Sequence, residues 1–280
     1  MAMKILLPGS LAEALALLSS QPNALPVAGG TDLFVRWPEH PERHDRPLLD
    51  LSGIPELRPC ALDRQRLLLG ATTTYLDLLL DPALSAEFPL LAAAARQIGA
   101  VQIQARGTWV GNVVNGSPAA DGVLALMACD GRVEVRSDTE RVEVPLADFY
   151  TGYRRTRLRP GQLVTAIIVP RQPRSHEYLE KVGSRRAQTI GKVGLAVCRV
   201  AGAWRVVVNG MAPAVRRCPS LEQALASGSL PSSVADWRPL IHNDLAAIDD
   251  LRSTRAYREE VLARLLDAFA ARRAMTPESS

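Results

Sequence analysis

The 280-residue chain has few of the residues that build metal and cluster sites. It holds only four cysteines, Cys60, Cys129, Cys198 and Cys218, and no two of them form a C-x-x-C pair. This spacing predicts neither an iron–sulfur cluster nor a zinc ribbon, and it favours buried thiols in a reducing compartment. The four histidines show no ligand spacing with cysteines or carboxylates. We therefore expect no metal site in this chain.

Long apolar runs are also missing. No stretch approaches the roughly 20 apolar residues that a membrane-spanning helix needs. The first apolar residues, Ile5-Leu6-Leu7, end at Pro8-Gly9, which is too early for the core of a signal peptide. Ser10 and Glu13 have instead the spacing of a helix capping box. These features predict a cytoplasmic protein without a membrane span.

Charge of one sign does not dominate, since 33 basic residues face 29 acidic ones along the whole chain. Such a mild imbalance does not require a nucleic-acid partner. The arginine pairs Arg154-Arg155 and Arg185-Arg186 lack the interleaved aromatic residues of a nucleic-acid surface. We interpret them as a strand edge or a partner contact. Nucleic-acid binding is the alternative, and a steep salt dependence would reveal it.

The common nucleotide motifs G-x-G-x-x-G and Walker A are absent, but two other glycine-bearing segments are present. Residues 28–33 read AGGTDL, and residues 108–121 read TWVGNVVNGSPAAD, in which Gly111-Asn112 and Asn115-Gly116-Ser117-Pro118 are two turn signals. Each leads into a helix-like stretch and offers bare main-chain N–H groups, which suit a phosphate. Two such segments favour a dinucleotide site of a design other than the Rossmann fold.

Each segment also has a plainer interpretation. Gly29-Gly30 alone is more often a tight turn between a strand and a helix than a binding loop. Asp121 falls in the first turn of a helix that Pro118 begins, where it would complement the helix dipole or accept hydrogen bonds from sugar hydroxyls. The residues by themselves leave both interpretations open.

The pattern of apolar residues divides the chain into three units, at residues 1–52, 53–170 and 171–280. In the first we expect helices at 10–18 and 33–37, strands at 24–28 and 48–51, and a loop at 40–46. In the second we expect strands at 57–62, 66–71, 132–136, 141–144 and 162–169, and helices at 72–80, 90–98 and 118–129. In the third we expect a linker at 171–175, three antiparallel strands at 178–183, 193–200 and 204–209, and helices at 220–227 and 255–272. The last helix carries an apolar stripe of Tyr257, Val261, Leu265 and Phe269, with Leu262, Leu266 and Ala268 beside it.

At these segments the chain resembles the FAD-binding medium subunit of the molybdenum hydroxylases, the flavoproteins of the xanthine dehydrogenase, aldehyde oxidase and carbon monoxide dehydrogenase type. Residues 27–33 resemble the family's AGGT-like loop, and residues 108–121 resemble its T-[IL]-G-G-N…SP-x-x-D loop. Residues 148–156, 178–186 and 250–258 resemble three further family segments, in order. Val110 stands where the family usually has a glycine, which puts the geometry of that loop in question because valine avoids positive φ.

The resemblance implies an α+β fold. A two-part FAD-binding α/β domain of the vanillyl-alcohol-oxidase (PCMH) type would be followed by a C-terminal domain with a three-stranded antiparallel sheet and helices. The resemblance also implies the cofactor-binding residues. The first clamp would be Val27, Ala28, Gly29, Gly30, Thr31, Asp32 and Leu33, and the second would be Thr108, Val110, Gly111, Asn112, Ser117 and Asp121. Val164 would form an apolar wall, and Lys181 would lie near the flavin, although an exposed strand lysine is the alternative for Lys181.

The resemblance further implies a function in electron transfer. The chain would hold FAD non-covalently, since neither glycine segment contains a histidine or cysteine for a covalent link. Electrons would come from [2Fe-2S] clusters on a small iron–sulfur subunit and leave to NAD or another acceptor. Molybdopterin would lie on a large subunit, the assembly being a heterotrimer or a dimer of heterotrimers. No catalytic side chain is expected in this chain. The alternative is a free-standing FAD-dependent oxidoreductase with its own small-molecule substrate.

Overall fold

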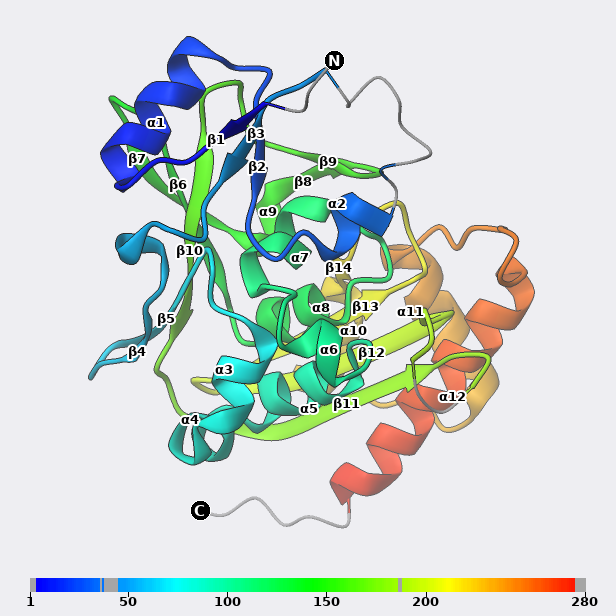
Figure 1. Ribbon diagram of the computed structural model, residues 1–280. Helices are drawn as coiled ribbons and strands as arrows, with labels where there is room; N and C mark the ends of the chain where they lie inside the picture. Colours follow the sequence, from blue (N-terminus) through cyan, green and yellow to red (C-terminus); the bar gives the residue numbers. More distant parts are fainter. Residues whose placement is uncertain (1–3, 36, 38–44, 186–187, 275–280) are drawn as a thin grey trace.

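The computed structural model describes residues 4–35, 37, 45–185 and 188–274 (Figure 1). The N-terminal unit is a small parallel sheet with strand order β1-β3-β2, flanked by two helices. Its elements are β1 (Ile5–Leu6), α1 (Leu11–Ser20), β2 (Leu25–Val27), α2 (Thr31–Val35) and β3 (Leu48–Asp50). Ser10 caps α1, as predicted, by accepting the N–H of Glu13 at 3.2 Å. Most of the predicted loop at 40–46 lies outside the described residues.

The second sheet is antiparallel, with strand order β4-β5-β10-β6-β7. Its strands are β4 (Cys60–Leu62), β5 (Arg66–Gly70), β6 (Arg132–Arg136), β7 (Arg141–Pro145) and β10 (Leu163–Pro170). The strand predicted from Leu57 was wrong at its start, because Pro55 begins a 3-10 turn, η3 (Pro55–Leu57), that comes before β4. The central strand β10 is buried along almost its whole length, so this sheet carries the core of the middle of the chain.

The helices in the middle of the chain are α3 (Tyr75–Leu80), α4 (Pro82–Glu87), α5 (Pro89–Gln97), α6 (Val101–Gln104), α7 (Trp109–Asn115), α8 (Asp121–Ala128) and α9 (Leu146–Phe149). Of these, α7 and α9 pack against strands of this sheet. Thr74 caps α3 in a reciprocal capping box with Asp77, as the threonine run predicted. Pro89 opens α5, also as predicted. Four of these helices, α4, α6, α7 and α9, were not predicted, nor was the hairpin of β8 (Tyr150–Gly152) and β9 (Arg155–Thr156).

The C-terminal unit contains the three antiparallel strands that the sequence predicted. They are β11 (Arg174–Val182), β12 (Val193–Val200) and β13 (Ala203–Asn209), and the two-residue strand β14 (Arg216–Arg217) adds a fourth at the edge. The linker predicted at 171–175 was wrong in its last residues, because Arg174 already pairs with Val200 in the sheet. The helices of this unit are α10 (Pro219–Ser227), η4 (Val234–Asp236), α11 (Trp237–Asp244) and α12 (Arg255–Ala274).

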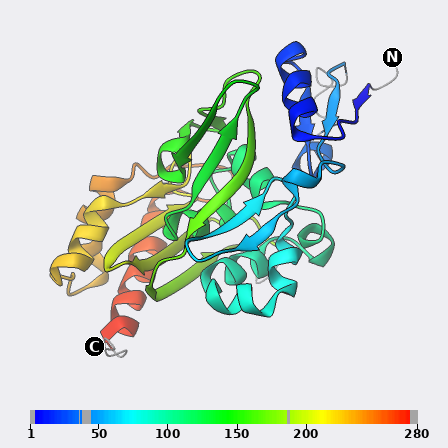
Figure 2. The ribbon, with the colours of Figure 1, turned by 90° about the vertical axis from the view of Figure 1, so that its left-hand side faces the viewer.

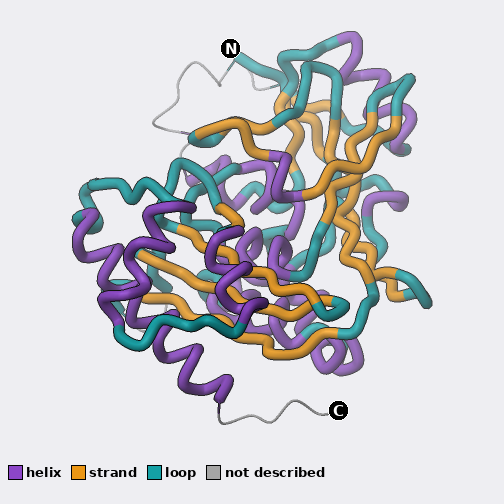
Figure 3. Tube along the Cα trace, turned by 180° about the vertical axis from the view of Figure 1, so that it is seen from behind, coloured by secondary structure: helices purple, strands orange, loops and turns teal. Residues whose placement is uncertain are grey.

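The C-terminal sheet lies between two layers of helices. Helices α5 and α8 pack on one face, and α10 and α12 pack on the other. Figure 3 shows the second layer in front of the strands, and Figure 2 shows the N-terminal unit and the C-terminal helices at opposite ends of the molecule. Because α8 also lies next to α7, which packs against β10, it connects the middle of the chain to the C-terminal sheet.

At the start of α12, the buried face is shifted by one residue from the predicted apolar stripe. Leu262, Leu266 and Phe269 are buried, but Tyr257 is 42% exposed and Arg258 takes the inward position. Each helical residue rotates the face by about 100°, so this small shift replaces an aromatic residue with a buried cation. The mixed helix and strand architecture confirms the predicted α+β fold class.

Candidate functional site

The first glycine segment is a strand-to-helix turn with free main-chain donors. β2 ends at Val27, α2 begins at Thr31, and Gly30 between them has φ 70°, in the left-handed region. The N–H groups of residues 29–33 find no acceptor within the part of the chain that the structure describes. The first N–H groups of a helix have no partner inside it. This turn therefore offers a row of donors to an external anion.

The second segment differs from the prediction. Thr108 is the N-cap of α7, and its hydroxyl accepts the N–H of Gly111 at 3.0 Å. Gly111-Asn112 thus lies inside a helix and not in a turn, and only Gly116, with φ 61°, forms the left-handed end of that helix. Because Val110 has helical geometry with negative φ, valine fits this position without strain.

The first segment touches the turn that comes just before the second segment. A Cβ atom placed on Gly29 would lie 1.9 Å from the carbonyl oxygen of Arg106. One placed on Gly107 would lie 3.4 Å from the hydroxyl of Thr31. At Gly29, only glycine allows the approach to the Arg106 carbonyl. The turn before α2 and the turn before α7 therefore form one continuous wall, although they are far apart in the sequence.

This wall borders a cavity of about 530 Å³. Most of the site residues expected from the sequence line it, from both segments: Val27, Ala28, Gly29, Gly30, Thr31, Asp32, Leu33, Thr108, Gly111 and Asn112. One side of α7 supplies the floor, because residues 111, 112, 114 and 115 lie on the same face of a helix. The cavity thus lies between the N-terminal unit and the middle of the chain.

Ten further residues line the cavity and were not expected as site residues: Leu25, Pro26, Arg46, Tyr75, Ile98, Ile103, Gly107, Val114, Asn115 and Arg154. Arg154 had been interpreted as a strand-edge or partner-contact residue, but its guanidinium donates to the Asn115 side chain at 3.0 Å. Its Nε is buried and has no hydrogen-bond partner among the described residues. Its place in the family-like segment at 148–156 was the only sequence feature that could have pointed to it.

The electrostatic character of the cavity suits an anion with hydroxyl groups. The charged side chains on its wall are Asp32, Arg46 and Arg154, two cations and one carboxylate. Burial, together with the negative charges of Asp32 and Asp121, raises the pKa of the Tyr75 hydroxyl well above its ordinary value. Tyr75 is protonated at neutral pH, as an unperturbed tyrosine also is, so its hydroxyl is a hydrogen-bond donor on a residue that lines the cavity.

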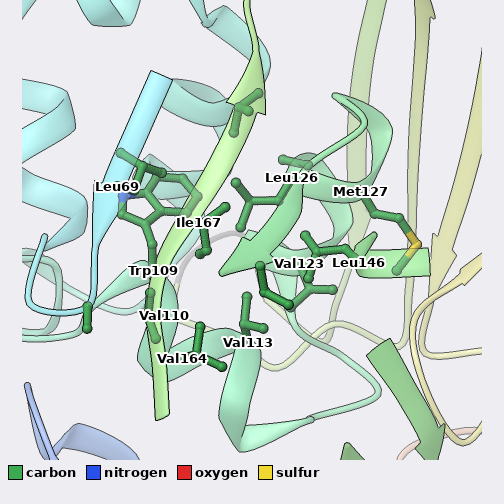
Figure 4. Packing of buried hydrophobic residues seen from close by; sticks show 14 of the residues in the cluster. Leu69, Trp109, Val110, Val113, Val123, Leu126, Met127, Leu146, Val164 and Ile167 are labelled. Atoms are coloured by element: carbon green, nitrogen blue, oxygen red, sulfur yellow. The ribbon is translucent and has the colours of Figure 1, made fainter. Parts of the chain in front are cut away.

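Two of the expected residues belong to the hydrophobic core. Val110 is 5% exposed and Val164 is 1% exposed, and both lie in the cluster that Trp109, Leu69 and Ile167 share (Figure 4). Neither lines the cavity. They pack α7 against β10, so they lie behind the floor of the cavity.

Three other expected residues also lie outside the cavity lining, near the start of α8. The Ser117 hydroxyl accepts the N–H of Ala119 at 3.3 Å. Lys181, on β11, donates to the Asp121 carboxylate at 2.6 Å and to the carbonyl of Gln97 at 3.2 Å. Lys181 is thus a buried, paired residue, with 8% of its side chain exposed, and the alternative of an exposed strand lysine was wrong.

Asp121 is held from two strands at once. Besides Lys181, the Asn209 amide on β13 donates to Asp121 at 3.2 Å. Burial raises the pKa of the Asp121 carboxyl, and Lys181 and Asn209 oppose that rise. This cluster is therefore a polar contact between α8 and the C-terminal sheet, close to Asn112, whose side chain accepts the N–H of Val123 at 3.1 Å.

Of the second arginine pair, Arg185 lies outside the cavity lining. The Arg185 guanidinium donates to the carbonyl of Gln188, and Arg186 lies outside the described residues. Among the residues that the structure describes, no helix is both long and apolar enough to cross a bilayer.

Comparison with known proteins identifies the family. The family model described as the FAD binding domain in molybdopterin dehydrogenase matches residues 1–172. The putative xanthine dehydrogenase FAD-binding subunit XdhB of Escherichia coli is 31% identical over 229 residues, covering 79% of this chain and 78% of that one. The nicotine 6-hydroxylase medium subunit of Paenarthrobacter nicotinovorans is 28% identical, covering 92% of this chain and 93% of that one.

The fold has the same relatives among solved structures. A chain of carbon monoxide dehydrogenase from Hydrogenophaga pseudoflava superposes with a TM-score of 0.87 and 26% identity, covering 96% of each chain. The family model matches more than half of the chain, one relative covers most of it, and the shared fold extends along nearly all of it. All three comparisons point to an FAD-binding subunit, which suits the cavity between the glycine segments. The chain belongs to the family of oxidoreductase subunits that carry the FAD-binding domain of molybdopterin dehydrogenases.

Proposed function

We propose that this chain holds FAD non-covalently in the cavity between its two glycine segments and serves as the electron-transfer subunit of a molybdenum-containing hydroxylase. The observation that carries the proposal is the row of N–H groups at residues 29–33, which have no partner in the part of the chain that the structure describes and belong to residues lining a cavity whose floor is α7. FAD, when bound, supplies the redox chemistry, and the chain binds and orients it.

The residues of the cavity fit the diphosphate of such a cofactor. Main-chain N–H groups at a helix start hold phosphate oxygens without a buried counter-charge. The Nε of Arg154, unpartnered among the described residues, adds a charged donor to a residue that lines the same cavity. We assign the diphosphate to the N–H groups of Gly29, Gly30 and Thr31, with Thr108 and Gly111 closing the other side.

The remaining lining residues suit the other parts of the cofactor. Asp32 can accept hydrogen bonds from hydroxyl groups, and Asn112 and Asn115 can donate or accept them. Apolar surface for an aromatic ring system comes from Ile98, Ile103 and Val114. Behind this lining, Val110 and Val164 support the floor, and Ser117, Asp121 and Lys181 fix the turn that leads into α8.

The expected three-part division, at residues 1–52, 53–170 and 171–280, is our proposal for the domains. The three larger sheets support it, since all the strands of each sheet fall within a single one of these ranges. The cofactor would then lie between the first two domains, and the third would hold α8 in place.

We further propose that the partners are a small subunit with [2Fe-2S] clusters and a large subunit with molybdopterin. The relatives carry names such as medium subunit and medium chain, which imply larger and smaller companions. The assembly would be a heterotrimer or a dimer of heterotrimers in the cytoplasm. NAD or another external acceptor would take the electrons.

The test is to express the chain with and without its two partners and to record absorption spectra. Flavin bands near about 375 and 450 nm are expected in both preparations, with iron–sulfur absorbance only in the complex. We expect substrate to bleach the flavin bands only in the complex. Substrate turnover by the isolated yellow chain would instead show a free-standing oxidoreductase, and a colourless chain that takes up no FAD would contradict the proposal.

A further inference from the structure

A row of three residues crosses the C-terminal sheet opposite the start of α8. Lys181 on β11 pairs with Gly194 on β12, and Gly194 pairs with Asn209 on β13. Directly paired residues of an antiparallel sheet point to the same face. Since the middle residue has no side chain, the two outer ones flank an open strip of backbone, and the Asp121 carboxylate is held above it by both of them.

The Gly194 backbone lies so close to the Asn209 side chain and to α8 that a larger residue would not fit at this position. A Cβ atom on Gly194 would lie 2.5 Å from Oδ1 of Asn209 and 3.0 Å from a methyl carbon of Leu124 on α8. Asn209 is fully buried, and its Oδ1 has no hydrogen-bond partner among the described residues. A leucine-like residue would be more favourable at such a position if only packing mattered. We conclude that the fold keeps an asparagine at position 209 because its side-chain amide donates the hydrogen bond to Asp121.

A second contact starts at the next residue. The N–H of Gly210 donates to the carbonyl of Pro118 at 2.7 Å, in the turn that leads to Asp121. Gly210 has φ 74°, and a Cβ atom there would lie 2.4 Å from the carbonyl oxygen of Lys192. Only glycine fits this place, so the direction of its N–H is set by the chain on both sides of it.

Arg258 on α12 holds Gly210 in place through hydrogen bonds to the main chain. Its guanidinium donates to the carbonyls of Lys192, at 2.7 Å, and of Gly210, and to the Asp250 carboxylate at 2.6 Å. The residue is 1% exposed. An arginine buried this deeply is rare unless it is paired, and its planar fork holds three acceptors in one fixed arrangement.

We infer that Asn209 and Arg258 are positioning residues for the cofactor: they hold the turn 118–121, and with it α8 and Asn112, in the geometry that the FAD cavity needs. This inference rests on the proposed function. It assigns a role to the C-terminal domain, whose described residues support the FAD site from behind and are not among those that line the cavity. It also gives a reason for a buried arginine on α12, a helix that does not line the cavity.

The first experiment titrates the FAD-free full-length chain with FAD and measures the dissociation constant. We expect Asn209→Ala and Arg258→Lys each to weaken FAD binding by roughly tenfold or more, a loss of the size that removal of outer-shell hydrogen bonds causes at metal sites. Leu266→Ala is the matched control, because Leu266 is fully buried on α12 and belongs to the C-terminal core alone. It should lower the stability of the chain but leave the FAD dissociation constant within about twofold.

The second experiment uses Asn209→Asp, which keeps the size of the side chain. The introduced carboxylate would face Asp121, with Lys181 and Tyr75 as the other titratable groups around Asp121. Two carboxylates at this distance share a proton, so one of them has a raised pKa. When protonated, the introduced carboxyl group can donate to Asp121 as the amide does. FAD affinity of this variant should therefore recover as the pH is lowered from about 8 to about 6, whereas wild-type affinity should change little.

The outcomes distinguish the positioning role from the proposed function. If the wild-type chain does not bind FAD at all, the proposed function fails. If the wild type binds FAD and the three variants bind it equally well at every pH, the positioning role is overturned while the proposed function stands. If Leu266→Ala weakens FAD binding as much as Asn209→Ala does, the effect is general destabilisation and the inference is also overturned.

Discussion

Replacing Gly29 with alanine should abolish most of the FAD binding of this chain. The added Cβ would overlap the carbonyl oxygen of Arg106, which is main chain and cannot rotate away. The turn before α2 must then move away from the turn before α7. Overpacking against a rigid neighbour costs up to about 3 kcal/mol, which corresponds to roughly a hundredfold weaker FAD binding if the cost falls on the bound state. Equilibrium titration of the FAD-free variant with FAD measures the change.

Gly53→Ala is the matched control for this prediction. Gly53 also lies in a turn of the N-terminal half, but its added Cβ would meet nothing closer than the carbonyl oxygen of Pro8 at 3.8 Å, among the described residues. The FAD affinity of the Gly53→Ala variant should equal that of the wild type. Equal affinities of the Gly29→Ala and Gly53→Ala variants would show that the contact between the two glycine segments does not shape the site.

The largest loss of stability is expected for Lys181→Met. The variant leaves the Asp121 carboxylate buried without its cation, a change that typically costs about 3–5 kcal/mol. Burial already raises the pKa of Asp121, and removal of the ammonium raises it further. The folded state then binds a proton that the unfolded state releases, so stability falls as the pH rises from the unfolded-state pKa toward the raised one. Urea unfolding of the FAD-free variant should thus show a larger loss at pH of about 8 than at about 5.

Two further variants test whether the loss of stability comes from the unpaired buried charge. Lys181→Met combined with Asp121→Asn removes both charges and should recover much of the lost stability. Arg132→Met removes the cation of an exposed pair with Glu143, where both side chains are 39% exposed, and should cost at most about 1 kcal/mol. If Lys181→Met behaved like Arg132→Met and showed no pH dependence, the buried pair would not be what joins α8 to the C-terminal sheet.

The sequence predicted the elements whose cause is local. Ser10 and Thr74 start helices through their own side chains, Pro89 starts α5, and the alternation of apolar residues marks the three long antiparallel strands of the C-terminal sheet. The resemblance to a family supplied the fold class, which no single pattern in the chain could give. Ten of the expected cofactor residues line the cavity because they lie in the two segments themselves.

What the sequence could not predict depends on contacts between distant residues. The helix α7 was taken for a turn, because Gly111-Asn112 resembles a turn and the cap that makes it helical is the hydroxyl of Thr108. Arg154 enters the cavity only because its hairpin packs on the end of α7, where a Cβ on Gly116 would lie 3.1 Å from its Cα. Asp121 and Lys181 are 60 residues apart, and only the folded sheet brings them together.

The central claim is that the main chain of the first glycine segment binds the diphosphate of FAD, in a cavity that the second segment closes from the other side. The most direct measurement is an equilibrium titration of the FAD-free chain with FAD and, in parallel, with riboflavin, which has the same ring system and no phosphate. The claim predicts one FAD per chain and riboflavin binding weaker by at least about a hundredfold, since the charge-assisted hydrogen bonds to phosphate are lost. Riboflavin binding as tight as that of FAD, or no binding of FAD, would contradict it.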